Sequence, residues 1–185
     1  MTEKEKMLAG EWYTVSAPQL TAENLTMQEL CYDYNALRPH QQEERRTLLE
    51  KMLGRVGENP HIEPVFFCDY GYNVEIGDHF FANHNLVLVD PGRICFGSHV
   101  FIGPNCGFYT AGHPLDVPSR NAGIEFAKPI VVGNDVWFGG NVVVLPGVTI
   151  GAGSVIGAGS VVVRDIPAHV VAVGNPCRPI RKLSV

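Results

Sequence analysis

The sequence predicts an all-β solenoid of hexapeptide repeats that follows a short helical segment. The first observation is a period of six, because apolar residues recur at that spacing without a slip at Val132, Phe138, Val144, Ile150, Ile156 and Val162. The second is uneven composition: residues 1–58 hold 17 of the 33 charged side chains but only 3 of the 20 glycines. The third is one interruption of the period, between about residues 108 and 129.

A period of six fits neither an α-helix nor a coiled coil. It fits a β-solenoid in which each hexapeptide forms one flat face and turns one corner, so that three hexapeptides complete a triangular coil. The recurring apolar residue then points into the narrow prism, and a glycine follows four of the six, where the chain turns. Because each coil is buried only by its neighbours, the two ends need caps, and the tail 167–185 is a candidate.

The N-terminal region, residues 1–58, is predicted to be helical and to form a cap on the solenoid domain of residues 59–185. Its first apolar stripe is Met27, Leu30, Tyr34 and Leu37, with Thr21 as a possible N-cap. A second stripe runs from Leu48 to Val56 and is closed by Gly57.

Composition excludes several classes of protein. The net charge of −5 and the absence of a long basic run argue against a nucleic-acid-binding protein. No apolar stretch is long enough for a membrane span, and the first residues lack a secretory signal. Five cysteines with no CxxC spacing suggest neither a disulfide framework nor a zinc site, so we expect a cytoplasmic protein.

The interruption, residues 109–129, is predicted to be a loop projecting from the prism. It is rich in polar residues, Gly and Pro, and it begins with Thr110-Ala111-Gly112-His113-Pro114. A long insertion in a regular solenoid is more often functional than accidental, so the loop is a candidate site.

These motifs resemble the maltose and galactoside O-acetyltransferases. The resemblance rests on the hexapeptides, the His113 motif and the opening that runs from Glu3 to Tyr13, together with Cys68-Asp69-Tyr70-Gly71-Tyr72-Asn73, Phe81-Ala82-Asn83, Asn134-Asp135-Val136-Trp137-Phe138-Gly139 and Gly174-Asn175-Pro176-Cys177-Arg178. It covers almost the whole chain. It implies a left-handed parallel β-helix, acetyl-CoA as co-substrate with no metal, and a homotrimer with active sites between subunits. The handedness rests on the resemblance alone, since ordinary parallel crossovers are right-handed.

Acetyl transfer to a hydroxyl needs a base, an oxyanion donor and a fixed thioester. His113 falls where the family has its catalytic histidine, and the ordinary pKa of histidine suits a base. Asn83 falls where the family has an asparagine beside that histidine, and its amide could hold the acceptor hydroxyl. Glu125 could orient His113 or be a solvated loop charge. Asp69 and Asn85 are further acceptor-binding candidates.

The resemblance places acetyl-CoA along the solenoid. Trp137 would wall the pantetheine channel, the Gly140 N–H would face the thioester oxygen, and Ala158 would allow close approach of the cofactor. Val163 and Arg164 end the last coil. Arg178, Arg181 and Lys182 form a basic cluster suited to the phosphates of CoA, although a solvated tail would have the same composition.

The N-terminal segment departs from the family pattern. Galactoside acetyltransferases hold the sugar with an aspartate and an arginine, and Val15 and Asn24 stand at the corresponding positions. The reaction type is therefore expected to persist with a different acceptor.

Three alternatives remain at this point. The same fold could act on an antibiotic or an amino-acid hydroxyl, although those relatives lack the N-terminal segment. It could be a γ-type carbonic anhydrase with zinc on His79, His84 and His99. It could also be a scaffold without activity, which would leave the His113 loop and the basic tail without a use.

Overall fold

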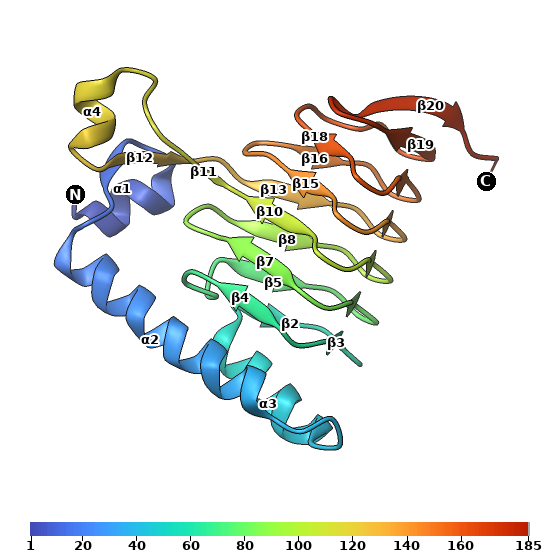
Figure 1. Cartoon of the computed structure of the whole chain (residues 1–185), viewed down its shortest axis with the longest axis horizontal. Helices are drawn as coiled ribbons and strands as arrows, with labels where there is room; N and C mark the ends of the chain where they lie inside the picture. The colour runs from blue at the N-terminus through green and yellow to red at the C-terminus, as the bar shows by residue number, and fades with distance from the viewer. Residues whose placement is uncertain (185) are drawn as a thin grey trace.

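The computed structural model describes residues 1–184 and shows a left-handed parallel β-helix capped by helices (Figure 1). Three sheets form its faces, and all their strands pair in parallel except the last strand of the third sheet. The first sheet contains β4 (Phe66–Cys68), β7 (Leu86–Val89), β10 (Gly107–Tyr109), β15 (Val143–Val144) and β18 (Val161–Val162). The second contains β2 (Arg55–Val56), β5 (Val74–Ile76), β8 (Ile94–Phe96), β13 (Ile130–Val132) and β16 (Thr149–Ile150). The third contains β3 (His61–Ile62), β6 (Phe81–Ala82), β9 (Phe101–Ile102), β14 (Trp137–Phe138), β17 (Val155–Ile156), β19 (Val170–Val173) and β20 (Arg178–Lys182).

The core confirms the period of six. Each of the six apolar residues that defined the repeat is at most 2% exposed, and they stack in register on neighbouring coils. Phe96, Phe108 and Phe138 fill the prism with edge-to-face contacts of about 5 Å between ring centroids. The solenoid therefore follows directly from the apolar pattern.

The N-terminal region contains three helices, α1 (Glu3–Ala9), α2 (Pro18–Ala36) and α3 (Gln42–Met52), with the short strand β1 (Tyr13–Thr14) after the first. The two expected helices correspond to α2 and α3. Thr21 is not the N-cap of α2, because Pro18 already begins that helix. Thr2 and Glu5 form a capping box at the start of α1, a helix that the apolar pattern did not predict.

The solenoid begins at β2, slightly before the boundary expected after residue 58. The residues from Leu53 to Val56 leave α3 and enter the second sheet, so the second apolar stripe spans a helix and a strand. Helix α2 packs against β4 and buries Cys31 and Tyr34 there, and the Tyr34 hydroxyl donates to the Ile62 carbonyl at 2.6 Å. Figure 1 shows α2 and α3 along the early coils, where they cover one end of the prism.

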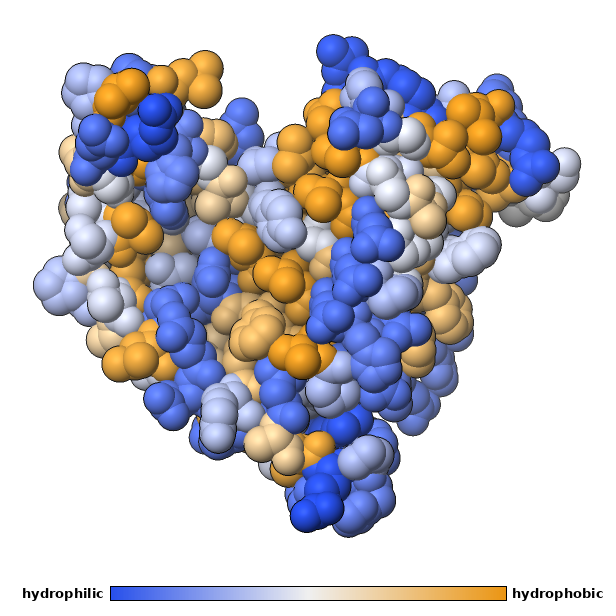
Figure 2. All heavy atoms as spheres, in the orientation of Figure 1, coloured by the Kyte–Doolittle hydropathy of each residue, from blue (hydrophilic) through white to orange (hydrophobic). Residues whose placement is uncertain are grey.

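The interruption at 109–129 projects from the prism and folds back. Its two arms, β11 (Ala111–Gly112) and β12 (Ile124–Ala127), pair antiparallel, and α4 (Val117–Asn121) lies between them. The other edge of β12 pairs antiparallel with β1, so the N-terminal segment and the projecting loop form one small sheet. In Figure 2 the α4 end and the C-terminal strands stand out as two separate projections at the top.

The tail closes the other end of the solenoid. Strand β20 turns back and pairs antiparallel with β19, which places its five exposed residues along the end of the third sheet. None of the helices formed by residues 1–184 has the length and apolar character that a bilayer span requires.

Candidate functional site

A cavity of about 350 Å³ lies between the N-terminal region and the root of the projecting loop. Four parts of the chain surround it, and its lining residues are Val15, Ser16, Leu20, Thr21, Asn24, Asp69, Tyr70, Val89, Pro91, Ala111 and Glu125. Two of these residues, Asp69 and Glu125, are site candidates from the sequence, and Val15 and Asn24 are the two positions that depart from the family pattern. Of the three acceptor-binding candidates, Asp69 lines this cavity, whereas Asn83 and Asn85 do not.

His113 lies beside this cavity, immediately after β11. Its Nδ1 is 3.0 Å from the Ile124 carbonyl oxygen, on the facing arm of the loop. A carbonyl can only accept, so Nδ1 carries the proton and the lone pair of the neutral ring is on Nε2. The side chain is 47% exposed, so the imidazole ring is open to a reactant.

Glu125 lies between His113 and the N-terminal segment. Its Oε1 is 3.4 Å from His113 Nε2, and its Oε2 accepts a hydrogen bond of 2.6 Å from the Tyr13 hydroxyl. Burial and the adjacent Glu125 carboxylate both raise the pKa of Tyr13, so its hydroxyl keeps the proton it donates. The group that orients His113 through Nδ1 is therefore the Ile124 carbonyl, while Glu125 faces the opposite nitrogen.

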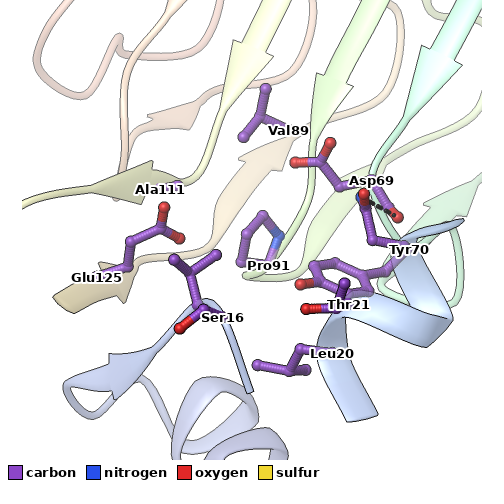
Figure 3. A pocket seen from close by; sticks show the side chains of 11 residues that line it. Ser16, Leu20, Thr21, Asp69, Tyr70, Val89, Pro91, Ala111 and Glu125 are labelled. Carbon is purple, nitrogen blue, oxygen red and sulfur yellow. Dashed lines mark hydrogen bonds between the residues drawn. The ribbon is translucent and has the colours of Figure 1, made fainter. Parts of the chain in front are cut away.

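Asp69 forms the opposite wall of the cavity (Figure 3). Burial raises the pKa of its carboxyl to about 6, and the Glu125 carboxylate adds to the rise. Its main chain is held on two sides, because its N–H donates to Asp90 at 2.8 Å and its carbonyl accepts from Asn24 at 3.0 Å.

Asp90 is a fully buried carboxylate behind this wall. It accepts hydrogen bonds of 2.8, 3.0 and 2.8 Å from the consecutive N–H groups of Asp69, Tyr70 and Gly71. Burial raises its pKa to about 7, although these three donors act in the opposite direction. Asp90 is not among the candidates from the sequence, since an aspartate before a proline is typical of an ordinary turn.

The remaining catalytic candidates lie on a different edge of the prism. We call the corner that precedes the first-sheet strands the asparagine edge: residues 83–85, 103–106, 139–142 and 157–160. It contains four predicted site residues: Asn83, Asn85, Gly140 and Ala158. His113 instead belongs to the edge that follows the first-sheet strands. Strand β7 (Leu86–Val89) spans the first sheet from one of these edges to the other. Within one chain, Asn83 and His113 therefore lie on opposite edges and do not meet.

Main-chain hydrogen bonds connect the asparagine edge from coil to coil. The Asn105 N–H donates to His84, the Asn141 N–H to Pro104 and the Gly159 N–H to Gly140, each at 2.8–2.9 Å. Within the described chain the Gly140 N–H itself donates to no main-chain carbonyl, so it is free to meet a ligand.

Asn83 and Asn85 differ in their immediate partners. The Asn83 side-chain oxygen accepts from the His84 N–H at 2.7 Å, and the Asn85 amide donates to Asn105 at 2.8 Å. Ala158 is exposed on the same edge, three coils further along the solenoid.

Apart from Gly140 and Ala158 on the asparagine edge, the cofactor candidates occupy three separate places. Trp137 is 56% exposed on the outer surface of the third sheet, between Phe101 and Val155 in register. Val163 and Arg164 follow β18 and so share the edge from which the projecting loop leaves. Arg178, Arg181 and Lys182 all lie on the exposed strand β20.

The three histidines of the anhydrase alternative do not converge. His79 and His99 stack on one corner with ring centroids 4.8 Å apart, whereas His84 lies on the asparagine edge with its ring against the Pro64 carbonyl. Among the described residues no group of three metal-ligating side chains is found. The geometry therefore does not favour a zinc enzyme.

Comparison with known proteins identifies the family. The family model for the maltose acetyltransferase hexapeptide capping motif matches residues 6–57, and that for the bacterial transferase hexapeptide matches residues 129–164. A putative acetyltransferase of Saccharomyces cerevisiae is 48% identical over 97% of this chain and 92% of its own length. The chain belongs to the maltose and galactoside acetyltransferase family. A putative acetyltransferase of Staphylococcus aureus is 50% identical over 99% of this chain and 92% of its own.

Solved members of the maltose and galactoside acetyltransferase family share the whole fold. A maltose O-acetyltransferase from Clostridium difficile matches with a TM-score of 0.98 and 44% identity, over 100% of this chain and 99% of its own. A galactoside acetyltransferase in complex with coenzyme A matches with a TM-score of 0.95 and 42% identity, over 100% and 92%. A hexapeptide-repeat acetyltransferase from Vibrio cholerae, complexed with acetyl coenzyme A, matches at 0.92 and 41%, over the full length of both chains.

Family membership makes this chain an acetyltransferase and confirms the fold and family predicted from the motifs. The sequence missed Tyr13, Asp90 and the Ile124 carbonyl as parts of the site. Only the pairing of β1 with β12 brings Tyr13 to Glu125, and they are 112 positions apart in the chain. No local pattern could have indicated that contact.

Proposed function

We propose that the enzyme transfers the acetyl group of acetyl-CoA to a hydroxyl of a sugar or sugar-like acceptor, with His113 as the general base. The observation that carries this proposal is the geometry of His113: its Nδ1–H donates to the Ile124 carbonyl, and its basic Nε2 lies beside the cavity. A neutral imidazole with a fixed tautomer and an exposed ring meets the requirement for a base in direct attack.

The reaction then proceeds in one sequence of bond changes. Nε2 takes the hydroxyl proton while the acceptor oxygen attacks the thioester carbon. The carbonyl oxygen becomes an oxyanion next to the free N–H of Gly140, and the Asn83 amide holds the acceptor oxygen. When the tetrahedral intermediate collapses, the C–S bond breaks and the imidazolium returns its proton to the departing thiolate. The products are the acetyl ester and CoA thiol.

Glu125 would act on His113 from the side of Nε2, not from the side of Nδ1. A carboxylate 3.4 Å from that nitrogen would attract the positive charge that the ring gains during proton transfer. Tyr13 holds the other carboxylate oxygen in place at 2.6 Å. Glu125 would therefore stabilise charge rather than select the tautomer.

The family members solved with coenzyme A and acetyl coenzyme A support the cofactor assignment. In this chain, Trp137 would pack against the pantetheine arm, and Ala158 would leave room for it on the asparagine edge. Val163 and Arg164 would border the channel. Arg178, Arg181 and Lys182 present three cations on exposed β20, where phosphates of CoA could reach them.

A homotrimer with sites between subunits completes the proposal. His113 and the asparagine edge lie on opposite edges of the first sheet of one chain. A second copy that offers its asparagine edge to the His113 edge of the first would assemble base, oxyanion donor and thioester. Three such contacts close a ring in which each copy contributes to two sites.

The acceptor cavity supports a small polar acceptor. Its mixed lining includes the side chains of Thr21, Asn24 and Asp69, which can hydrogen-bond to hydroxyl groups. We also propose a cytoplasmic location, because all five cysteines are free thiols.

The decisive experiment is an acceptor screen with purified enzyme and acetyl-CoA, in which released CoA thiol is the readout. Acetylation of at least one hydroxylated sugar, abolished in His113→Ala, would support the proposal. Release of CoA that His113→Ala leaves unchanged would contradict it.

A further inference from the structure

The acceptor cavity carries negative charge on two sides. Figure 3 shows the carboxylates of Asp69 and Glu125 on opposite walls, with Pro91 between them. Among the cavity-lining residues that the structure describes, none is a lysine, an arginine or a histidine. A ligand that enters this space therefore meets two carboxylates and no fixed cation within the wall.

The two carboxylates differ in their partners. Glu125 is engaged by the Tyr13 hydroxyl through Oε2 and faces His113 through Oε1. Asp69 forms no ion pair with any of residues 1–184. The Asn24 amide donates to the main-chain carbonyl of Asp69 at 3.0 Å, and it also interacts with the Asp69 carboxyl, whose pKa it lowers. Asp69 is thus the cavity carboxylate that has no cationic partner among the described residues.

The position of Asp69 is fixed before any ligand arrives. The buried Asp90 carboxylate binds the consecutive N–H groups of residues 69–71, and Gly71 adopts a left-handed conformation with φ of 71°. A side chain at Gly71 would collide with the Met52 carbonyl, so this turn has little freedom to rearrange. A preorganised carboxylate loses little entropy on binding.

The environment of Asp69 favours a positively charged ligand over a neutral one. Burial raises the pKa of its carboxyl to about 6, which means that the ionised form is poorly solvated in the empty cavity. Above that pH a neutral hydroxyl offers one ordinary hydrogen bond, whereas an ammonium group offers a charge-assisted bond about twice as strong.

We propose that Asp69 selects an acceptor that carries a protonated amine in addition to the hydroxyl that is acetylated, such as an amino sugar. This inference rests on the proposed function and narrows its substrate class. The amine binds at Asp69, and the hydroxyl lies toward His113 on the opposite side of the cavity.

The experiment compares glucosamine, glucose and N-acetylglucosamine as acceptors at pH 7.5, with CoA thiol release as the rate. Treatment of the products with alkaline hydroxylamine distinguishes esters, which are cleaved, from amides, which are not. We expect kcat/KM for ester formation on glucosamine to exceed that on each neutral sugar by about tenfold or more. Asp69→Asn should bring this ratio to about one.

Asp33→Asn is the matched control, because it removes the same charge from an exposed position of α2 and should leave the ratio unchanged. Thermal melting establishes that the variants are folded. If Asp69→Asn does not fold, the inference is still tested by whether the parent enzyme prefers glucosamine to N-acetylglucosamine.

Equal use of glucose and glucosamine by the parent would overturn the inference while leaving the proposed function intact. A preference that persists in Asp69→Asn would also overturn it, as would an amide product, which would place the amine at the thioester. Absence of CoA release with all three sugars would overturn this inference, and the broader acceptor screen would then show whether the proposed function also fails.

Discussion

Two inactive variants should restore activity to each other if the site is shared between copies. One variant carries His113→Ala. The other carries Asn83→Ala together with Ala158→Trp, which removes an amide and fills the asparagine edge. The altered residues are exposed or only half-buried, so both chains should fold. Each homotrimer contains the same defect at all three sites and should be nearly inactive.

The magnitude follows from the directed order of the ring. If the two chains carry different affinity tags and are co-expressed, purification on both tags yields only mixed trimers. Whichever variant is in the majority, one interface joins an intact His113 to an intact asparagine edge, and the other two do not. The mixed trimer should therefore show about one third of the parental turnover per trimer.

The assay is steady-state release of CoA thiol with an acceptor that the parent enzyme uses. Mixed trimers of His113→Ala with tagged His113→Ala provide the control for purification. If each site were built from one chain, every site in the mixed trimer would still contain a defect. If the mixed trimers were no more active than the homotrimers of the two variants, the shared site would be refuted.

Four further predictions concern single features of the site. His113→Ala should lower turnover by about 10²-fold or more but leave the melting temperature nearly unchanged, since the side chain is half exposed; near-normal turnover would exclude it as the base. Replacing Arg181 and Lys182 with Ala should raise KM for acetyl-CoA and weaken its salt dependence. Removing the 3′-phosphate of CoA should then cost this variant less than the parent, and an unchanged cost would assign both cations to a solvated tail. Val15→Asp, which places a carboxylate in the cavity, should improve KM for galactosides or glucosides more than kcat, by about 10-fold or more for a charged hydrogen bond; parental activity at low millimolar KM would show that other residues hold the sugar. Because the pKa of Asp69 is raised from 3.8 to about 6, the native protein binds the extra proton, and stability relative to Asp69→Asn should fall as pH rises from 4 to 6, by at most about 3 kcal/mol. Urea denaturation of both proteins across that range measures the difference, and parallel curves would contradict the shift.

The sequence by itself determined the solenoid, because its cause is local and repeated. An apolar residue at a repeat position, such as Phe138 or Ile156, points into the prism in every coil of the solenoid. The period of six therefore identifies the buried positions without reference to which coils lie next to one another. The same regularity distinguishes the interruption at 109–129 from the repeats and so indicates the loop that contains His113. The apolar pattern predicted the N-terminal helices less accurately. Helix α1 depends on a capping box, and the chain after α3 passes into β2.

Only the tertiary structure decided how the site is assembled. Tyr13 meets Glu125, and Asp90 holds the turn at Asp69, through contacts between segments that are far apart in sequence. The assignment of Asn83 and His113 to opposite edges depends on where each corner falls around the prism, which a six-residue pattern leaves undefined because all three corners look alike. The three sheets are built from the same repeat, so they differ only in which of the projecting loop, the N-terminal cap and the tail lies against each of them.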